Sequence, residues 1–337
     1  MSVRDSVLEA LQRDQGIYLS GEKLSEELNV SRAAVWKAIK SLREEGYRID
    51  AVTRRGYCLR DSEAPLTEKE IRSFLPVRYR NNGIYVYEVT DSTNNRAREI
   101  AIGADPAHPA GPGEESGAAV IALQQSAGKG RLGRSFFSPK EGIYLSIIVK
   151  PKFDLTRSVL VTVATAAAVA EAVDKICGQE METQIKWVND VYLDGKKICG
   201  ILTEGITDFE SGQIDHLVIG IGINTTLEGF PEDLLQVAGA VRGDYSKSAL
   251  AAEVITRVLD YTEDLEAREF MKTYKEKSFL IGRDVKVFKG VYRTSPEEDL
   301  SGVPARVLGI SEDGGLDVIY TDGRRETLVT GEVTIRT

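Results

Sequence analysis

The sequence predicts an α+β protein built from three parts, and three observations support this prediction. Residues 1–60 carry short helical repeats of apolar residues followed by a basic hairpin pattern. Residues 66–278 mix strand-like and helix-like segments, and residues 279–337 return to short β runs separated by glycine-containing turns. Such mixtures are typical of sheets that carry helices on a face. We therefore expect three domains, at residues 1–62, 66–278 and 279–337.

The bulk composition is that of an ordinary globular protein. The chain has 337 residues, of which 42% are hydrophobic and 28% are charged. The longest apolar stretch, residues 159–173, is interrupted by Thr162, Thr165 and Glu171 and is shorter than the roughly 20 residues that cross a bilayer. No membrane partner is expected. The first residues lack the apolar core of a secretory signal, so we expect a cytoplasmic protein.

The inventory of reactive side chains argues against two classes of enzyme. Cys58, Cys177 and Cys199 are widely spaced and odd in number, which indicates reduced thiols. His108 and His216 lie far apart in the chain. The sequence therefore supports neither a zinc site nor a Ser-His-Asp triad.

The net charge of −9 is unevenly distributed along the chain. Residues 1–60 hold 11 Lys and Arg against 9 Asp and Glu, whereas residues 61–337 hold 32 against 43. Within the head, residues 31–60 hold 8 basic and 3 acidic side chains. Contact with phosphates needs locally clustered cations, so any nucleic-acid contact is expected in this segment.

The head shows the pattern of a winged helix-turn-helix. Ser20 and Ser31 stand where N-cap hydroxyls begin two successive helices, and Val35, Ile39 and Leu42 give the second of these a buried stripe. A hairpin pattern with a basic tip follows at residues 47–59. A solvated three-helix packing module is the alternative, but helix, turn, helix and basic hairpin in this order favour DNA binding. The expected DNA contacts are Ser31, Arg32, Ala33, Lys37, Lys40, Arg54 and Arg55.

The central part predicts a mixed or antiparallel sheet with helices, and the C-terminal part a small β-barrel. Residues 61–65 form a polar linker, and residues 103–117 read as a mobile loop. Helices are expected at residues 67–75, 95–102, 158–177, 248–265 and 268–277. Strands are expected at residues 83–89, 120–125, 143–149, 183–193, 196–206, 216–224, 285–288, 305–310, 316–320 and 326–330.

The sharpest local feature is GKGRLGRS at residues 128–135. Its glycines let the backbone approach a ligand closely, and Lys129, Arg131 and Arg134 bring three cations to one loop, as phosphate binding requires. The segment also matches GxGxxG, but that dinucleotide motif needs a helix to follow, and here a turn and a strand pattern follow. A flexible exposed loop is the remaining alternative.

Three strand-like segments carry further polar groups. KWVND, GKKICGIL and GIGIN lie on consecutive strand-like runs, with Lys186, Asn189 and Lys197 among apolar neighbours. Side chains on adjacent strands lie about 5 Å apart, so these groups can converge, although a solvated outer face is the alternative. The small residues of GIGIN leave room for a ligand over the sheet.

DSTN at residues 91–94, QQSAGKGRLGR, KWVNDVYLDGKKICGIL, VIGIGIN and the terminal GEVTIR, in this order, resemble the biotin protein ligases, and the head resembles that of their bifunctional ligase-repressors. The resemblance implies a class II synthetase-like sheet and an SH3-like C-terminal barrel. It also implies two steps: biotin and ATP give biotinyl-5′-AMP and pyrophosphate, and a lysine of the biotin carboxyl carrier protein, as in acetyl-CoA carboxylase, then takes the biotin. Operator DNA is the second implied partner, bound by a homodimer that biotinyl-5′-AMP, as corepressor, promotes.

The resemblance also implies roles for individual residues of the central part. The biotin contacts are Ser92, Thr93, Asn94, Gln125, Lys129, Gly130, Arg131, Lys197 and Gly200. The ATP and adenylate contacts are Arg131, Arg134, Lys186, Trp187, Asn189, Asp190 and Asn224. The catalytic residues are Arg131, Lys197 and Asp190, and Asp190 also contacts Mg²⁺.

Two departures from the family pattern and three alternatives remain. The family usually has arginine at Lys129 and proline at Val188, and lysine lacks the planar fork that grips phosphate. The alternatives are a ligase whose head does not regulate, a ligand-responsive transcription factor without catalysis, and a lipoate ligase-like acyl transferase. The STN turn together with GKGRLGR argues against the last of these.

Overall fold

The computed structural model describes residues 2–14, 17–44, 47, 49–53, 55–59, 66–105, 116–152, 158–178, 181–207, 214–288, 302–329 and 332–335. These residues divide into two compact units. The first contains Met1–Phe74 with Gly243–Ala252, and the second contains Leu75–Arg242 with Glu253–Thr337. Most of the expected loop at residues 103–117 lies outside the described residues.

The head has the order helix, helix, helix, hairpin that the sequence predicts. It consists of α1 (Val3–Arg13), α2 (Gly21–Glu27), α3 (Arg32–Glu44), β1 (Ile49–Val52) and β2 (Gly56–Leu59). The expected N-caps are confirmed, because Ser20 Oγ accepts from the Lys23 amide at 3.0 Å and Ser31 Oγ accepts from the Ala34 amide at 3.1 Å. The short helix α4 (Glu68–Phe74) belongs to the same unit.

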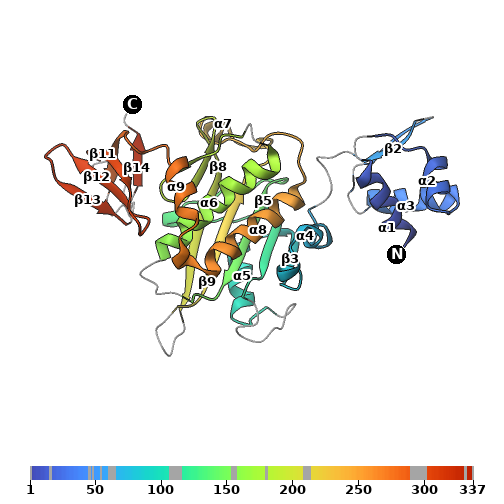
Figure 1. The fold of residues 1–337 in the computed structure, drawn as a ribbon, viewed down its shortest axis with the longest axis horizontal. Helices are drawn as coiled ribbons and strands as arrows, with labels where there is room; N and C mark the ends of the chain where they lie inside the picture. The colour runs from blue at the N-terminus through green and yellow to red at the C-terminus, as the bar shows by residue number, and fades with distance from the viewer. Residues whose placement is uncertain are drawn as a thin grey trace. The chain divides into compact units, whose positions relative to one another are not determined.

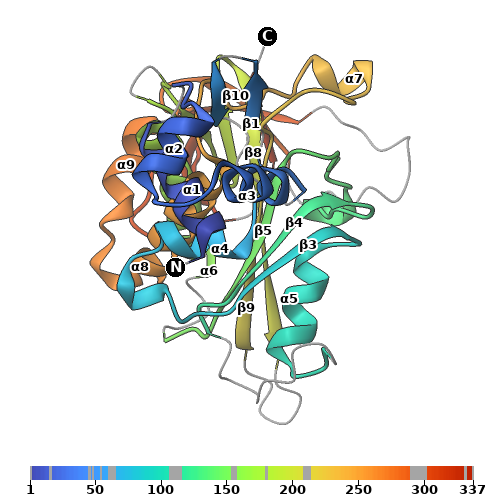
Figure 2. The same cartoon turned by 90° about the vertical axis from the view of Figure 1, so that its right-hand side faces the viewer.

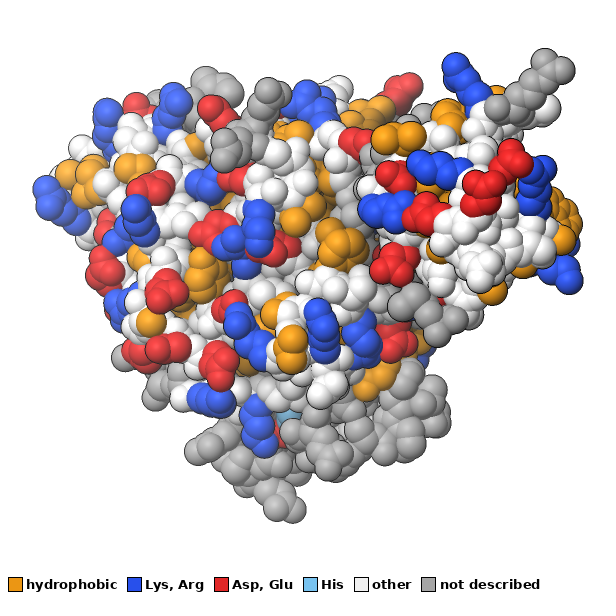
Figure 3. Space-filling view, turned by 45° about the vertical axis from the view of Figure 1, so that its right-hand side comes forward, with side chains coloured by type: hydrophobic (Ala, Val, Ile, Leu, Met, Phe, Trp, Pro, Cys, Tyr) orange, Lys and Arg blue, Asp and Glu red, His pale blue; other side chains and the backbone are white. Residues whose placement is uncertain are grey.

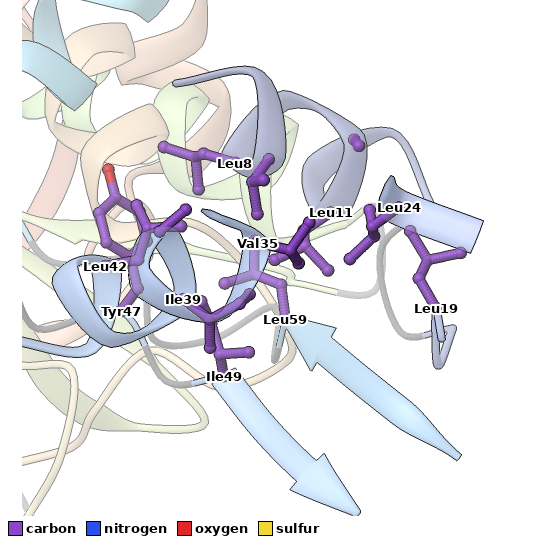
Figure 4. Close-up of a cluster of buried hydrophobic side chains, with 13 residues drawn as sticks. Leu8, Leu11, Leu19, Leu24, Val35, Ile39, Leu42, Tyr47, Ile49 and Leu59 are labelled. Atoms are coloured by element: carbon purple, nitrogen blue, oxygen red, sulfur yellow. The ribbon is translucent and has the colours of Figure 1, made fainter. Parts of the chain in front are cut away.

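One apolar cluster holds the head together (Figure 4). Leu11, Leu24, Val35 and Leu42 are fully buried, so each of the three helices contributes its apolar stripe. The hairpin pairs β1 with β2 in antiparallel register, and Gly56 has a φ of +107° beside the Leu19 carbonyl. A side chain there would collide with that carbonyl, so the wing requires glycine.

Seven of the described strands form the central sheet, in the order β3-β4-β5-β9-β8-β7-β6. Their bounds are Ile84–Thr90 (β3), Ala119–Gln125 (β4), Ile143–Val149 (β5), Gln184–Lys186 (β6), Asp190–Leu193 (β7), Lys196–Thr207 (β8) and Ile214–Ile223 (β9). Strand β3 runs parallel to β4, and the other neighbours are antiparallel, so the sheet is mixed.

The expected single strand at residues 183–193 was wrong. Lys186 pairs with Asp190, so β6 and β7 form a tight hairpin whose turn is residues 187–189, with a cis peptide between Trp187 and Val188. The Trp187 indole donates to the Gly314 carbonyl at 2.9 Å, and the Asn189 amide donates to the Ile201 carbonyl at 3.0 Å. These acceptors lie far from the turn in the sequence and satisfy its polar groups. No local sequence pattern predicts such partners.

Helices cover both faces of this sheet (Figures 1 and 2). The apolar helix α6 (Ser158–Cys177) and α9 (Phe270–Lys277) lie on one face, and α5 (Thr93–Ala101) lies on the other. Arg257, in α8 (Lys247–Glu263), is ion-paired with Glu171 of α6. The short helix α7 (Glu232–Leu235) was not expected.

Helix α5 begins two residues earlier than expected. Ser92 is extended, at φ −156° and ψ 133°, and the helix starts at Thr93 rather than at Asn95. Thr93 and Asn94 therefore lie in the first turn of a helix above the sheet, which fixes their side chains.

The C-terminal strands form a five-stranded antiparallel sheet in the order β13-β12-β11-β10-β14. Their bounds are Asp284–Phe288 (β10), Val303–Ile310 (β11), Leu316–Tyr320 (β12), Arg325–Leu328 (β13) and Glu332–Ile335 (β14). Arg268, just before α9, is ion-paired at 3.0 Å with Asp313 in the turn between β11 and β12.

Charges of both signs are mixed on the face that Figure 3 shows, with Lys and Arg beside Asp and Glu. Among the described residues, no helix combines the length and apolar character of a membrane span.

Candidate functional site

The glycine-rich basic loop forms a hydrogen-bonded turn. Gly130 donates its amide to the Arg134 carbonyl at 2.7 Å, and Phe136 donates to the Gly128 carbonyl at 2.8 Å. Leu132 and Gly133 both have positive φ, at 58° and 73°, so the chain reverses sharply there. Strand β5 follows this loop, as predicted, and a dinucleotide-binding turn is thereby excluded.

This loop borders an open pocket, called the cavity below, between α5, the loop and the central sheet. Hydroxyl and amide side chains, cations, glycines and apolar side chains all contribute to its wall. The lining residues are Ser92, Thr93, Asn94, Gln125, Lys129, Gly130, Arg131, Phe136, Asn189, Lys197, Gly200, Ile201, Leu202, Gly220, Ile221 and Gly222.

All nine residues expected to contact biotin line this cavity. Ser92, Thr93 and Asn94 come from the start of α5, and Gln125 comes from the end of β4. Lys129, Gly130 and Arg131 come from the basic loop, and Lys197 and Gly200 come from β8. Segments separated by more than 100 residues therefore meet at one site.

The three cations of the cavity each have a neutral or acidic partner. Lys129 donates to Asn95 Oδ1 at 2.6 Å, and Arg131 Nη1 donates to Asn189 Oδ1 at 3.1 Å. Lys197 Nζ lies 2.7 Å from Asp190 Oδ1. These contacts hold the three cations around one space, where an anion can meet them.

Of the residues expected to contact the nucleotide, Arg131 and Asn189 line the cavity, and the others lie outside its lining. Trp187 is buried, and its indole N–H is used by the Gly314 carbonyl. Asn224 is buried, and its amide donates to the Gly239 carbonyl at 3.0 Å. The remaining members of this set, Arg134, Lys186 and Asp190, are exposed or half-buried in the described part of the chain.

Phe136 is a lining residue that the sequence did not predict. Gly200 and Gly222 are paired on β8 and β9, and an added Cβ would lie 3.0 Å and 2.4 Å, respectively, from the Phe136 ring. The ring therefore lies against this glycine pair. Two glycines in register across neighbouring strands were the available signal, because an aromatic ring can rest only where side chains are missing.

Two titratable side chains on the strands beside the cavity, Cys199 on β8 and Tyr192 on β7, keep their protons at neutral pH. Burial raises the pKa of the Cys199 thiol, so the thiol stays protonated. Burial also raises the pKa of Tyr192 to about 12, followed by the effect of Asp190.

The head presents a polar helix face suited to DNA. Ser31, Arg32, Ala33, Lys37 and Lys40 are all exposed on α3 or at its start, and Arg55 is exposed on the hairpin. Arg54 lies outside the described residues. Trp36 was not anticipated: its side chain is 56% exposed on α3, with Lys40 Nζ 5.9 Å from the ring centre.

Comparison with known proteins identifies the family. Residues 88–224 match the biotin/lipoate A/B protein ligase family, and residues 3–58 match an HTH domain. The chain is 33% identical over 261 residues to the bifunctional ligase/repressor BirA of Bacillus subtilis, covering 77% of this chain and 76% of that protein. The chain belongs to the biotin protein ligase family.

Two further relatives cover the chain more fully or share its fold. The bifunctional ligase/repressor BirA of Escherichia coli is 28% identical over 95% of this chain and 94% of its own length. The biotin protein ligase of Aquifex aeolicus, solved with biotin and ATP, superposes with a TM-score of 0.59 at 25% identity, covering 75% of this chain and 98% of that one. The expected family, its ligase character and its DNA-binding head are thus confirmed.

Proposed function

We propose that the cavity binds biotin and ATP, forms biotinyl-5′-AMP and transfers biotin to a lysine of a biotin carboxyl carrier protein. One observation carries this proposal: the nine residues expected to hold biotin line a single cavity with neutral groups and cations. Neutral hydroxyls and amides from α5 and β4 suit the uncharged ring system, whereas Lys129, Arg131 and Lys197 suit the carboxylate and the α-phosphate.

The chemistry requires positioning rather than a protein nucleophile. A carboxylate oxygen of biotin attacks the α-phosphorus of ATP, the bond to the β-phosphate oxygen breaks, and pyrophosphate leaves. Fixed cations neutralise the charge that develops on the phosphate oxygens. A carrier lysine then attacks the carbonyl carbon of the adenylate and releases AMP, and Arg131 retains the adenylate until that attack.

Asp190 is the residue that we assign to Mg²⁺. The described residues contain no group of three or more His, Cys, Asp or Glu that could hold a metal ion. Magnesium in nucleotide sites commonly takes one or two carboxylates and otherwise phosphates and water, so a single carboxylate suffices. Asp190 Oδ1 is buried and contacts only Lys197 Nζ in the described part of the chain. When bound, the ion would supply charge neutralisation on the phosphates.

The head gives this enzyme a second role in the cytoplasm, in which it binds operator DNA and represses transcription. One head offers few phosphate contacts, so tight binding needs two heads on a two-fold symmetric site. We therefore propose that biotinyl-5′-AMP promotes a homodimer, and that the adenylate and the operator each raise the affinity for the other. Residues Arg32, Lys37, Lys40 and Arg55 would supply the phosphate contacts.

Biotin-dependent exchange between ATP and pyrophosphate tests the catalytic proposal, because it needs no carrier. We expect exchange with biotin and none with lipoate. Exchange with lipoate alone would assign the chain to lipoate chemistry, and no exchange with either acid would leave a transcription factor without catalysis. Sedimentation and operator titration with and without biotinyl-5′-AMP test the repressor role: equal dimerisation and equal DNA affinity in both states would leave the head without a switch.

A further inference from the structure

A chain of buried and part-buried hydrogen bonds runs behind the neutral end of the cavity. Asn94 Nδ2 donates to Glu204 Oε2 at 2.6 Å, and Ser146 Oγ lies 2.6 Å from Asn94 Oδ1. Ser146 Oγ also lies 2.8 Å from Thr93 Oγ1, which is 3.1 Å from Gln125 Oε1. Glu204 and Ser146 do not line the cavity, yet they contact two residues that do.

From these contacts we propose that Glu204 and Ser146 are positioning residues, which set the donors and acceptors that the cavity offers to the ureido ring of biotin. This inference rests on the assignment of the cavity to biotin. The two ends of an amide have nearly the same shape, so packing alone does not decide which end of Asn94 points where. A hydroxyl can donate or accept, so Ser146 alone does not decide it either. An ionised carboxylate only accepts, as does the Leu202 carbonyl, and Glu204, at 2.6 Å against 3.5 Å for that carbonyl, is the closer of the two acceptors that hold Nδ2 on their side.

The orientation of Asn94 then determines the hydroxyl protons next to it. With Nδ2 on Glu204, the amide oxygen faces Ser146 and takes the single Ser146 proton. Ser146 is fully buried, and its single proton can reach Asn94 Oδ1 at 2.6 Å or Thr93 Oγ1 at 2.8 Å; the shorter contact assigns it to Asn94. Thr93 then donates its own proton to Gln125 Oε1 or to Ser146 Oγ, both inside the protein, so Thr93 Oγ1 offers the cavity only an acceptor. An N–H group of a ureido ring matches that acceptor.

Gln125 offers the cavity a hydrogen-bond donor, whereas Thr93 offers it an acceptor. Its Oε1 accepts from the Thr93 amide at 2.8 Å, and its Nε2 donates to Ser138 Oγ at 2.9 Å. An amide nitrogen carries two protons, so Gln125 has a second N–H for the cavity. A ureido carbonyl matches that donor. The pattern therefore selects a ring with N–H groups beside a carbonyl.

Asn94 occupies its place because Gly220 lies beneath it. A Cβ at Gly220 would lie 2.2 Å from Asn94 Oδ1, and Gly220 is the strand partner of Ser146 on β5 and of Leu202 on β8. Glu204 is two residues beyond Leu202, on the same face of β8, because side chains alternate along a strand. The arrangement thus follows from the sheet register.

Four variants test the proposal in the biotin exchange assay: Glu204→Leu, Glu204→Gln, Ser146→Ala and, as a control, Thr203→Val. Thr203 is the neighbour of Glu204 on β8, and its hydroxyl lies 3.0 Å from Thr162 on α6, the other side of the sheet. The probes are biotin and 2-iminobiotin, in which a protonated imine replaces the carbonyl acceptor with a donor. Thermal unfolding of each variant is measured alongside.

We expect Glu204→Leu and Ser146→Ala to raise the KM for biotin about tenfold, the effect of one lost buried hydrogen bond, with the KM for ATP and kcat nearly unchanged. The preference for biotin over 2-iminobiotin should fall in the same two variants. Glu204→Gln keeps an oxygen that accepts from Asn94 and should stay close to wild type, as should Thr203→Val.

The assay distinguishes a failure of the proposed function from a failure of the positioning role. If wild type shows no biotin-dependent exchange, the proposed function itself fails. If wild type is active but Glu204→Leu and Ser146→Ala keep the wild-type KM and ligand preference, the positioning role is refuted, even if both variants melt earlier. If Glu204→Gln is as impaired as Glu204→Leu, the effect belongs to the ion pair of Glu204 with Arg98, 3.8 Å away, and the orientation argument is overturned.

Discussion

Removing the Lys197 ammonium is the perturbation whose consequences follow most directly from the structure. Lys197→Met keeps the length and the apolar stem of the side chain and removes one of three cations lining the cavity. The side chain is 33% exposed, so the environment is neither bulk water nor a dry interior. At a separation of about 4 Å and an effective dielectric constant of about 20, two unit charges attract by about 4 kcal/mol.

Asp190, 2.7 Å from the Lys197 ammonium, competes with the phosphate for this charge and offsets part of that attraction. We therefore expect about 3 kcal/mol less stabilisation of the transition state. This corresponds to an exchange rate lower by roughly 10²-fold, in the range seen when one preorganised charge or donor is removed. Single-turnover adenylation, with biotin and ATP in excess, measures this effect apart from product release.

Lys196→Met is the matched control for this experiment. Lys196 is the preceding residue on β8, is exposed, and donates to the Leu235 carbonyl at 3.0 Å rather than lining the cavity. It should adenylate biotin at the wild-type rate. Equal rates for wild type and Lys197→Met would refute the role of this ammonium, and equal losses in both lysine variants would point to a general effect of charge.

Three further predictions concern the loop, the cavity floor and the head. Arg131→Gly should release biotinyl-5′-AMP into solution, detected as free adenylate after gel filtration; retention equal to wild type would contradict the clamp. Gly222→Ala should raise the KM for biotin at least tenfold, because its Cβ would lie 2.4 Å from the Phe136 ring and push the ring into the cavity; an unchanged KM would show that the ring lies outside the binding space. Trp36→Ala should weaken operator binding by roughly tenfold while exchange is unchanged, since this exposed ring lies among the cations of α3; unaltered operator titration would remove Trp36 from the interface.

That the residues proposed to contact biotin meet at one cavity could be predicted from the sequence, because these residues come in short local motifs. Ser92, Thr93 and Asn94 are consecutive, and Lys129, Gly130 and Arg131 are consecutive. Once the strands pair, all three residues of each motif line the cavity together. The winged head was predictable for a similar reason, since its caps and apolar stripes are local signals.

The positions of the residues proposed to contact the nucleotide were less predictable, because several of their polar groups have competing long-range partners. Trp187 donates to Gly314, 127 residues away, and Asn224 donates to Gly239. Both side chains are buried in structural contacts that depend on how sheets and turns pack. Phe136 was missed because its place depends on the register that sets Gly200 opposite Gly222. Assignment of Arg134, Lys186, Trp187, Asp190 and Asn224 to the nucleotide stays a prediction, as do the three domain ranges.

The central claim is that one cavity both forms and holds an adenylate of biotin. Isolation of the protein after incubation with radiolabelled biotin, ATP and Mg²⁺, followed by mass analysis of the bound material, tests it most directly. We expect biotinyl-5′-AMP in an amount equal to the protein, lost in Lys197→Met and retained in Lys196→Met. Recovery of unmodified biotin alone, with ATP intact in solution, would contradict it.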